Sequence, residues 1–244
     1  MPKSNYIHDF GGKGETLVLL HGFLGSSKYW SKLQPLLTNS GYRVITIDLL
    51  GFGNAPKPRN ANYHYEDHVN HVHDSIKSLN LHSFVLIGHS MGALVASRYT
   101  LTYPENVVSL VLLHPPLYKN SKEAHAILRS TGKRYRFFLD SKLREPGWII
   151  MRNLPFIRIH AHSSRAREKS LKNVIESAEI AGDLENIVVP TALLIGLRDR
   201  PEYIENIKRF SPNQSINVLH RNVSHHSPIQ EPDLVHDIII SALA

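Results

Sequence analysis

The sequence predicts an α/β fold in which a mostly parallel, twisted sheet is flanked by helices. Six short apolar runs rich in Val, Ile and Leu are bounded by Gly, Pro or Asp. The runs are continuous rather than alternating, which is typical of strands buried on both faces. Helical stretches follow the first three runs, and this alternation favours a doubly wound sheet. The apolar runs cover residues 16–22, 43–49, 84–90, 107–115, 191–197 and 215–221.

The helical stretches complete this pattern. We expect helices at 27–37, 65–80 and 91–103, each between two apolar runs, and a final amphipathic helix at 232–244. A single strand, "YIHDF", precedes the first core run, so the sheet is expected to have few N-terminal strands.

Residues 115–186 interrupt the alternation of strands and helices. The segment contains several helical patterns and no convincing buried strand, and Pro190 precedes the next apolar run. We therefore expect residues 1–114 and 187–244 to form one core domain. The segment 115–186 is expected to be a helical lid, inserted after the sixth strand.

Composition narrows the class of protein. The chain has 244 residues, of which 42% are hydrophobic, enough for one sizeable core. It has no cysteine, which excludes disulfides, cysteine-ligated zinc and a cysteine nucleophile. The N-terminus lacks the apolar core of a signal peptide, and no apolar run approaches the roughly 20 residues that span a bilayer. We expect a cytoplasmic protein without stable membrane insertion.

The basic charge is concentrated in one segment. The formal net charge is +7, and residues 115–186 hold 14 Lys/Arg against 8 Asp/Glu. This segment either attracts an anionic substrate or is a solvated helical cap, and the second interpretation is favoured. Nucleic-acid binding rests on the charge alone, because no helix–turn–helix, aromatic sheet motif or zinc module is present. We expect no nucleic-acid partner.

A candidate nucleophile lies between the third apolar run and its helix. Gly88-His89-Ser90-Met91-Gly92 fits the G-x-S-x-G nucleophile elbow. A very tight strand-to-helix turn leaves no space for side chains two residues before and after the serine. The helix that follows directs its N-terminus at the site, which favours developing negative charge.

A serine nucleophile needs a base, and the base needs an acid that orients it. Asp199 lies just past the apolar run at 191–197, where a loop would project over the edge of the sheet. Another acid could follow the strand ending near residue 113, but that position holds His114. Asp183 and Asp140 lie inside the expected lid, in the wrong context.

Two adjacent histidines, His225 and His226, compete for the role of the base. Only one of them can belong to a triad. Residues alone leave the choice open, with the other histidine in a supporting or surface position.

Backbone N–H groups are needed to bind an oxyanion. One is expected from Met91, directly after the nucleophile, and the other from Phe23, in the loop after the first core run. His21 and Gly22 support this loop, and His21 is expected to hold it by hydrogen bonds.

Together these residues resemble the α/β-hydrolase superfamily, above all its lid-bearing lipase and esterase-like branch. The resemblance rests on four stretches and covers nearly all of the chain outside 115–186. In the family, the triad histidine is followed by x-Pro-x-x-Glu. His226 fits this spacing and His225 misses it by one, so the resemblance favours a triad of Ser90, Asp199 and His226. The stretches are "LVLLHGFLGSS", "VITIDLLGFGNAPKP", "VLIGHSMGALVASRYTLTYPENVVSLVLL" and "PTALLIGLRD".

The resemblance implies a serine hydrolase that needs no cofactor. Relatives that use an Asp nucleophile are set aside because the nucleophile here is a serine. We expect a small-molecule ester of small to medium acyl chain as the substrate. Thioesterase, C–C bond hydrolase and menaquinone-pathway-type lyase activities remain alternatives, and so does a non-catalytic ligand receptor.

Two further groups of residues have open interpretations. His64, His68, His71 and His73 resemble metal-ligand spacing, but a solvated helix face is favoured and no metal is expected. Aromatic residues of the expected lid either line an acyl pocket or pack the lid onto the core. They are Tyr118, Tyr135, Phe137, Phe138, Trp148 and Phe156.

Overall fold

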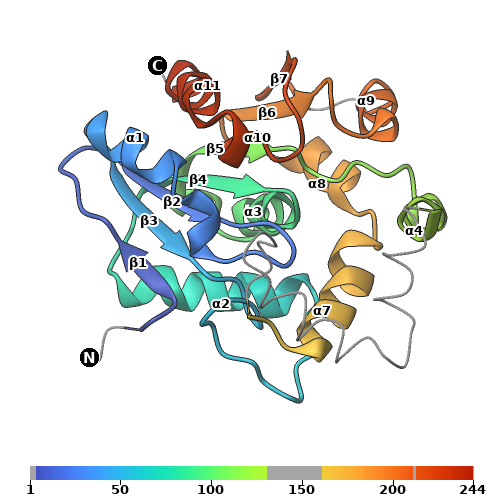
Figure 1. Ribbon diagram of the computed structural model, residues 1–244, viewed down its shortest axis with the longest axis horizontal. Coiled ribbons are helices and arrows are strands. Elements are labelled where there is room, and N and C mark those ends of the chain that lie inside the picture. The colour runs from blue at the N-terminus through green and yellow to red at the C-terminus, as the bar shows by residue number, and fades with distance from the viewer. Residues whose placement is uncertain (1–3, 131–160, 211–212, 244) are drawn as a thin grey trace.

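The computed structural model describes residues 4–130, 161–210 and 213–243, and its centre is a seven-stranded sheet (Figure 1). The strand order is β1-β3-β2-β4-β5-β6-β7, and every pair is parallel except β1 with β3. Each of the six apolar runs contains one of these strands, so the expected fold class is confirmed. The strands are β1 (Ile7–Asp9), β2 (Thr16–Leu20), β3 (Arg43–Ile47), β4 (Phe84–His89), β5 (Val107–Leu113), β6 (Thr191–Gly196) and β7 (Ile216–Arg221).

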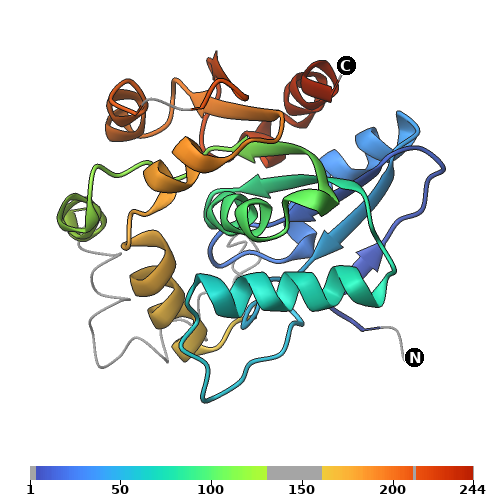
Figure 2. The same ribbon diagram turned by 180° about the vertical axis from the view of Figure 1, so that it is seen from behind.

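Helices cover both faces of the sheet (Figures 1 and 2). One face packs against α1 and α11, and the other packs against α2, α3 and α8. The helices are η1 (Ser27–Trp30), α1 (Leu33–Asn39), α2 (Tyr65–Ser78), α3 (Met91–Thr102), η2 (Pro104–Asn106), α4 (Ser121–Ser130), α7 (Ser164–Ser170), η3 (Leu171–Ile175), α8 (Ile180–Asn186), α9 (Pro201–Ile207), α10 (Ser227–Gln230) and α11 (Pro232–Leu243).

The described part of segment 115–186 is helical and holds α4, α7, η3 and α8. Five strands precede the segment, so it follows the fifth strand rather than the expected sixth. The single strand expected before the first core run and the four apolar runs that follow it already make five, so the expected position was wrong by one strand.

Strand β4 shows why the apolar runs are continuous. Val85 and Ile87 face the layer of α1 and α11, whereas Phe84 and Leu86 face the layer of α2 and α3. All four side chains are fully buried. A strand covered on both sides needs apolar residues at every position, because successive side chains point to opposite faces.

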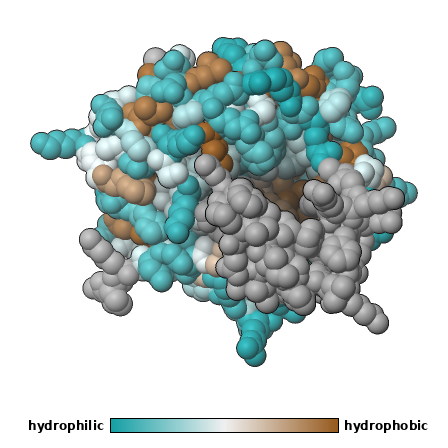
Figure 3. All heavy atoms as spheres, viewed as in Figure 1, coloured by the Kyte–Doolittle hydropathy of each residue, from teal (hydrophilic) through white to brown (hydrophobic). Residues whose placement is uncertain are grey.

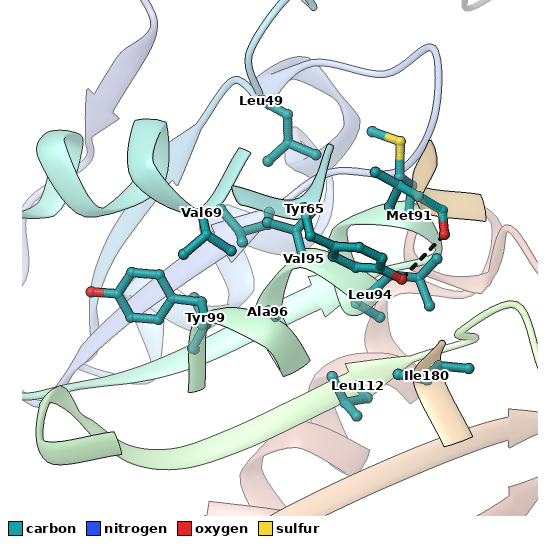
Figure 4. Close-up of a cluster of buried hydrophobic side chains, with 14 of the residues drawn as sticks. Leu49, Tyr65, Val69, Met91, Leu94, Val95, Ala96, Tyr99, Leu112 and Ile180 are labelled. Atoms are coloured by element: carbon teal, nitrogen blue, oxygen red, sulfur yellow. Dashed lines mark hydrogen bonds between the residues drawn. The ribbon is translucent and has the colours of Figure 1, made fainter. Parts of the chain in front are cut away.

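A buried tyrosine joins segment 115–186 to the core (Figure 4). The Tyr65 hydroxyl on α2 donates a hydrogen bond to the Val174 carbonyl in η3 at 3.1 Å. The Arg98 guanidinium lies 4.3 Å from the centre of the Tyr65 ring and pairs with Asp183 on α8. Burial raises the pKa of Tyr65, so the hydroxyl keeps its proton and remains a donor.

The histidines of α2 do not form a solvated face. His68 is fully buried, and its Nε2 lies 3.0 Å from the Ser170 hydroxyl of α7. Burial lowers the pKa of His68 to about 3, so the ring is neutral. The expectation of a solvated face is wrong for His68 because the start of α2 packs beneath α7. Among the described residues, no three His, Asp or Glu side chains are grouped as metal ligands.

No helix in the described ranges is long and apolar enough to cross a bilayer.

Two glycines form a matched test of packing at the turn after β4. A Cβ added to Gly88 would lie 2.6 Å from the Ala93 Cα, inside the normal contact distance, whereas a Cβ on Gly182 in α8 would meet nothing within 4 Å. We expect Gly88→Ala to lower the free energy of unfolding by at least about 2 kcal/mol. Gly182→Ala should raise it by about 0.5–1 kcal/mol because alanine favours the helix. Urea unfolding measures both, and equal effects would contradict the close approach at Gly88.

Candidate active site

The candidate catalytic residues meet at the carboxyl edge of the sheet. Ser90 follows β4, Asp199 lies in the loop after β6 and His225 lies in the loop after β7. The carboxyl ends of parallel strands share one edge, where open α/β sheets place their ligand sites. Residues more than a hundred positions apart in sequence are thereby brought within hydrogen-bond distance.

A strained turn presents Ser90. Its φ is +54° and its ψ is −120°, a conformation that a residue with a side chain rarely adopts. The Ser90 N–H donates to the Leu113 carbonyl at 2.9 Å and ties the turn to β5. A Cβ on Gly92 would lie 2.5 Å from the His21 carbonyl oxygen. Glycine on both sides of the turn therefore lets α3 begin directly against the ends of β2 and β4.

His225 lies between Ser90 and Asp199. Its Nε2 is 3.1 Å from Ser90 Oγ, and its Nδ1 is 2.7 Å from Asp199 Oδ2. The carboxylate accepts a hydrogen bond from the Nδ1–H of His225, which leaves the Nε2 lone pair directed at the Ser90 hydroxyl. A nucleophile, a base and an acid in this arrangement have the geometry of a Ser–His–Asp catalytic triad.

Asp199 is held in its ionised form. Burial by itself raises the pKa of this carboxyl, but the His114 Nδ1 at 3.5 Å and hydrogen bonds from His225 and the Arg200 N–H outweigh the burial. The net result is a pKa well below the usual range. The side chain is 6% exposed, so these donors replace most of the water that an anion would otherwise bind.

The geometry places His225, and not His226, in the position that the resemblance favoured for His226. His226 is the N-terminal flanking residue of α10, and its carbonyl accepts from Ile229 and Gln230. The x-Pro-x-x-Glu spacing follows the start of α10, with Pro228 in its first turn. The ring that reaches Ser90 instead belongs to the last residue of the preceding loop.

A hydrogen bond from the residue before the nucleophile fixes this loop. The Nε2–H of His89 donates to the His225 carbonyl at 2.8 Å, and the Tyr29 hydroxyl lies 3.1 Å from the same nitrogen. The rings of His89 and Tyr29 stack with centroids 4.6 Å apart. Burial lowers the pKa of His89 well below its ordinary value, so this ring stays neutral.

The loop after β2 lies against the nucleophile. A Cβ on Gly22 would lie 3.1 Å from the Ser90 Cβ, so the loop passes within contact distance of the serine. His21 holds the loop, since its Nδ1 donates to the Gly22 carbonyl at 2.8 Å and its Nε2 accepts from the Leu49 N–H at 3.0 Å. Phe23 follows in this loop, and Met91 begins α3, where N–H groups lack intrahelical acceptors. The oxyanion role of both amides remains a prediction.

Sequence reasoning missed one polar neighbour of the site. His114 ends β5, and its Nδ1 lies 3.5 Å from Asp199 Oδ2. The available signal was its place in the sequence, since a strand end at this edge of the sheet was considered for an acid and holds a histidine instead.

A cavity of about 1350 Å³ opens in front of Ser90. Figure 3 shows a hollow in this face with hydrophobic side chains inside it. Of the six aromatic residues whose role the sequence left open, Tyr118 lines the cavity. Those at positions 135, 137, 138, 148 and 156 lie outside the described residues. Apolar and aromatic residues that line the cavity include Phe23, Leu24, Tyr29, Tyr118, Leu128, Leu171, Ile175, Tyr203 and Ile229. Basic residues that line it are Lys28, Lys32, Arg198 and Arg200.

Comparison with known proteins defines the class. The family model of the alpha/beta hydrolase fold matches residues 15–164, which is more than half of the chain. The chain therefore belongs to the α/β-hydrolase family.

Individual relatives carry several activities in their names. The chain is 38% identical over 122 residues to the probable lysophospholipase BODYGUARD 4 of Arabidopsis thaliana, covering 49% of this chain and 29% of that protein. It is 26% identical over 240 residues to Lipase 3 of Moraxella sp. (strain TA144), covering 91% of this chain and 75% of that protein. An esterase from Exiguobacterium antarcticum has a similar structure, with a TM-score of 0.76, 21% identity and coverage of 98% and 95%.

The matches define the fold more sharply than the reaction. The chain spans less than a third of the length of BODYGUARD 4, the first of these relatives. Similar proteins also include a dehalogenase, a chloroperoxidase and a thioesterase domain. Family membership therefore leaves open which bond is cleaved.

Substitution of the two histidines separates their roles. We expect His225→Asn to lower kcat/KM by roughly 10⁴-fold, because it removes the base that contacts Ser90. His226→Asn should lower it by less than about tenfold, because the His226 ring packs edge-on against His225 with ring centroids 5.3 Å apart, whereas the hydrogen bonds to Ser90 and Asp199 come from His225. Steady-state kinetics with p-nitrophenyl butyrate compares them, and the reverse ranking would restore the choice favoured by the x-Pro-x-x-Glu spacing.

Proposed function

We propose that the protein is a serine hydrolase that cleaves carboxylic esters of small to medium acyl chain through an acyl-enzyme on Ser90. The observation that carries this proposal is the unbroken chain of contacts from Ser90 Oγ through the His225 ring to Asp199. The chain of contacts faces a cavity that can hold a substrate. The esterase and lipase names of similar proteins support the same reaction type.

The geometry supports a two-stage reaction. His225 Nε2 takes the Ser90 proton as Oγ attacks the ester carbonyl carbon, and the Phe23 and Met91 N–H groups stabilise the oxyanion. The protonated His225 then gives its proton to the departing alcohol, which leaves an acyl group on Ser90. Water, deprotonated by His225, attacks the acyl carbonyl, and the proton returns to Ser90 as the acid is released.

Asp199 contributes by keeping its charge. Since its pKa is held well below the usual range, the carboxylate is ionised throughout the neutral pH range. It therefore fixes the orientation of His225 and stabilises the imidazolium that forms during each proton transfer.

The cavity walls support an acyl substrate. The hydroxyls of Tyr118 and Tyr203 are 2.8 Å apart and bond to one another, so these rings present mainly apolar surface. Leu128 of α4 and Leu171 and Ile175 of η3 supply part of the wall from segment 115–186. We propose that this segment is the lid, since its described helices contribute side chains to the cavity.

A serine variant tests the mechanism directly. We expect Ser90→Ala to lower turnover of p-nitrophenyl butyrate by at least roughly 10⁴-fold and to abolish labelling by a fluorophosphonate probe. Ser78→Ala is the matched control, because Ser78 lies at the exposed end of α2 and bonds to the Ser75 carbonyl. Retained activity and labelling in the Ser90 variant would end the proposal.

A substrate series tests the bond that is cleaved. We expect p-nitrophenyl esters with acyl chains of about 2–8 carbons to be turned over faster than the matched thioesters. The turnover rate should decline for longer acyl chains. Faster cleavage of thioesters or vinylogous diketones would assign one of the other serine-dependent reactions. Binding without turnover of any of the three classes would favour a receptor.

A further inference from the structure

We propose that His114 is a positioning residue that shares the Asp199 carboxylate with His225 and sets how strongly Asp199 attracts the catalytic proton. The inference rests on the proposed function of Ser90, Asp199 and His225. His114 is not among the residues that line the cavity, and its ring centroid lies 5.8 Å from that of the His225 ring. The polar atom that it directs into the site, Nδ1, faces Asp199, so its effect would pass through this carboxylate.

The structure makes room for the His114 ring beneath the acid loop. His114 has a φ of +53°, a conformation that is unfavourable for a residue with a side chain. A Cβ on Gly196, at the end of β6, would lie 2.8 Å from the His114 ring. Glycine at position 196 therefore leaves the space that the ring fills. The buried His114 Nδ1 makes no hydrogen bond to the described residues, and it lies 3.5 Å from Asp199 Oδ2, the same oxygen that His225 contacts.

A buried hydroxyl selects the tautomer of His114. Ser227 Oγ is fully buried and lies 2.8 Å from His114 Nε2. Asp199 is an anion and can only accept, so the favourable arrangement has the His114 Nδ1 proton directed at Asp199. His114 Nε2 then accepts from the Ser227 hydroxyl. The contacts run from Ser227 through His114 and Asp199 to His225.

His114 stays neutral in these surroundings. Burial lowers its pKa, the nearby Asp199 carboxylate opposes this effect, and His225 lowers the pKa further. The other titratable groups that face it are His89 at the end of β4, His226 in the loop after β7 and Glu231 after α10. Glu231 is bound to Arg198 at 2.6 Å. A neutral donor to Asp199 stabilises the carboxylate without adding a positive charge near His225.

Removal of this donor should change the pH profile. With one donor fewer, Asp199 Oδ2 interacts more strongly with protonated His225, which holds its proton to higher pH. The acid limb of kcat/KM should therefore move to higher pH by roughly half a unit or more. A residue that served only to fill space would not move this limb.

Two substitutions separate the two nitrogens of His114. The amide nitrogen of Asn can occupy the place of Nδ1, and the amide group of Gln can reach the place of Nε2. We expect His114→Asn to keep the contact with Asp199 and the wild-type pH profile. His114→Gln should keep the contact with Ser227, lose the contact with Asp199 and shift the acid limb. Asn also tolerates a positive φ better than Gln, so thermal unfolding of both variants is measured alongside.

Spectroscopy of the unmodified protein gives an independent test that does not depend on the variants folding. In ¹⁵N-histidine-labelled protein, the ring nitrogens of His114 should show a proton on Nδ1 and none on Nε2 at neutral pH. A proton on Nε2 would overturn the proposal, and so would a pH profile of His114→Gln that matches the wild type. An equal shift in His114→Asn and His114→Gln would overturn it too.

The outcomes separate this inference from the proposed function. If the wild-type protein cleaves no ester, the proposed function fails, whereas the tautomer of His114 still reports on its contact with Asp199. If esters are cleaved and the tautomer is reversed, the role of His114 fails alone.

Discussion

The close approach of β4 and α3 at Ser90 is the constraint on which the rest of the site depends. The turn requires a positive φ at Ser90 and no side chains at Gly88 and Gly92. Because the turn is this tight, the serine hydroxyl lies above the sheet edge and the first N–H groups of α3 lie beside it. The backbone strain is confined to one residue because the buried strands β2 and β5 hold the turn on both sides.

This turn also organises the neighbouring loops. His89, the residue before the nucleophile, holds the carbonyl of His225, and the loop that contains Gly22 contacts Ser90 from the other side. The acid, the base and the nucleophile therefore share one buried framework of backbone contacts. Rearrangement of any one loop would alter hydrogen bonds to the others, so the site behaves as a unit rather than as three independent residues.

The sequence was sufficient for the features that depend on local pattern. Continuous apolar runs identified the buried strands β2 to β6, and the glycine spacing identified the turn at Ser90. The expected burial was wrong for β7, which forms an edge of the sheet and is mostly uncovered. The choice between His225 and His226 could not be made in this way, because adjacent residues of a loop have the same local signals. The x-Pro-x-x-Glu spacing indicates where α10 begins. Which histidine ring enters the site depends instead on the hydrogen bond from His89, which holds the loop at the His225 carbonyl. His114 was missed for a similar reason, since its role depends on Gly196 and Ser227, both distant in sequence.

Burial decides which of the clustered histidines can take a proton. His89 and His114 are almost completely buried, and burial lowers the pKa of both rings, so both are neutral. His89 donates to the His225 carbonyl, and His114 Nδ1 lies 3.5 Å from the Asp199 carboxylate. The side chain of His225 is 27% exposed and contacts both the nucleophile and the single carboxylate that lines the cavity in the described chain. The two buried rings stabilise the loop and the anion without competing for the proton. The three histidines therefore have different roles because their rings differ in exposure to solvent and in the atoms that they contact.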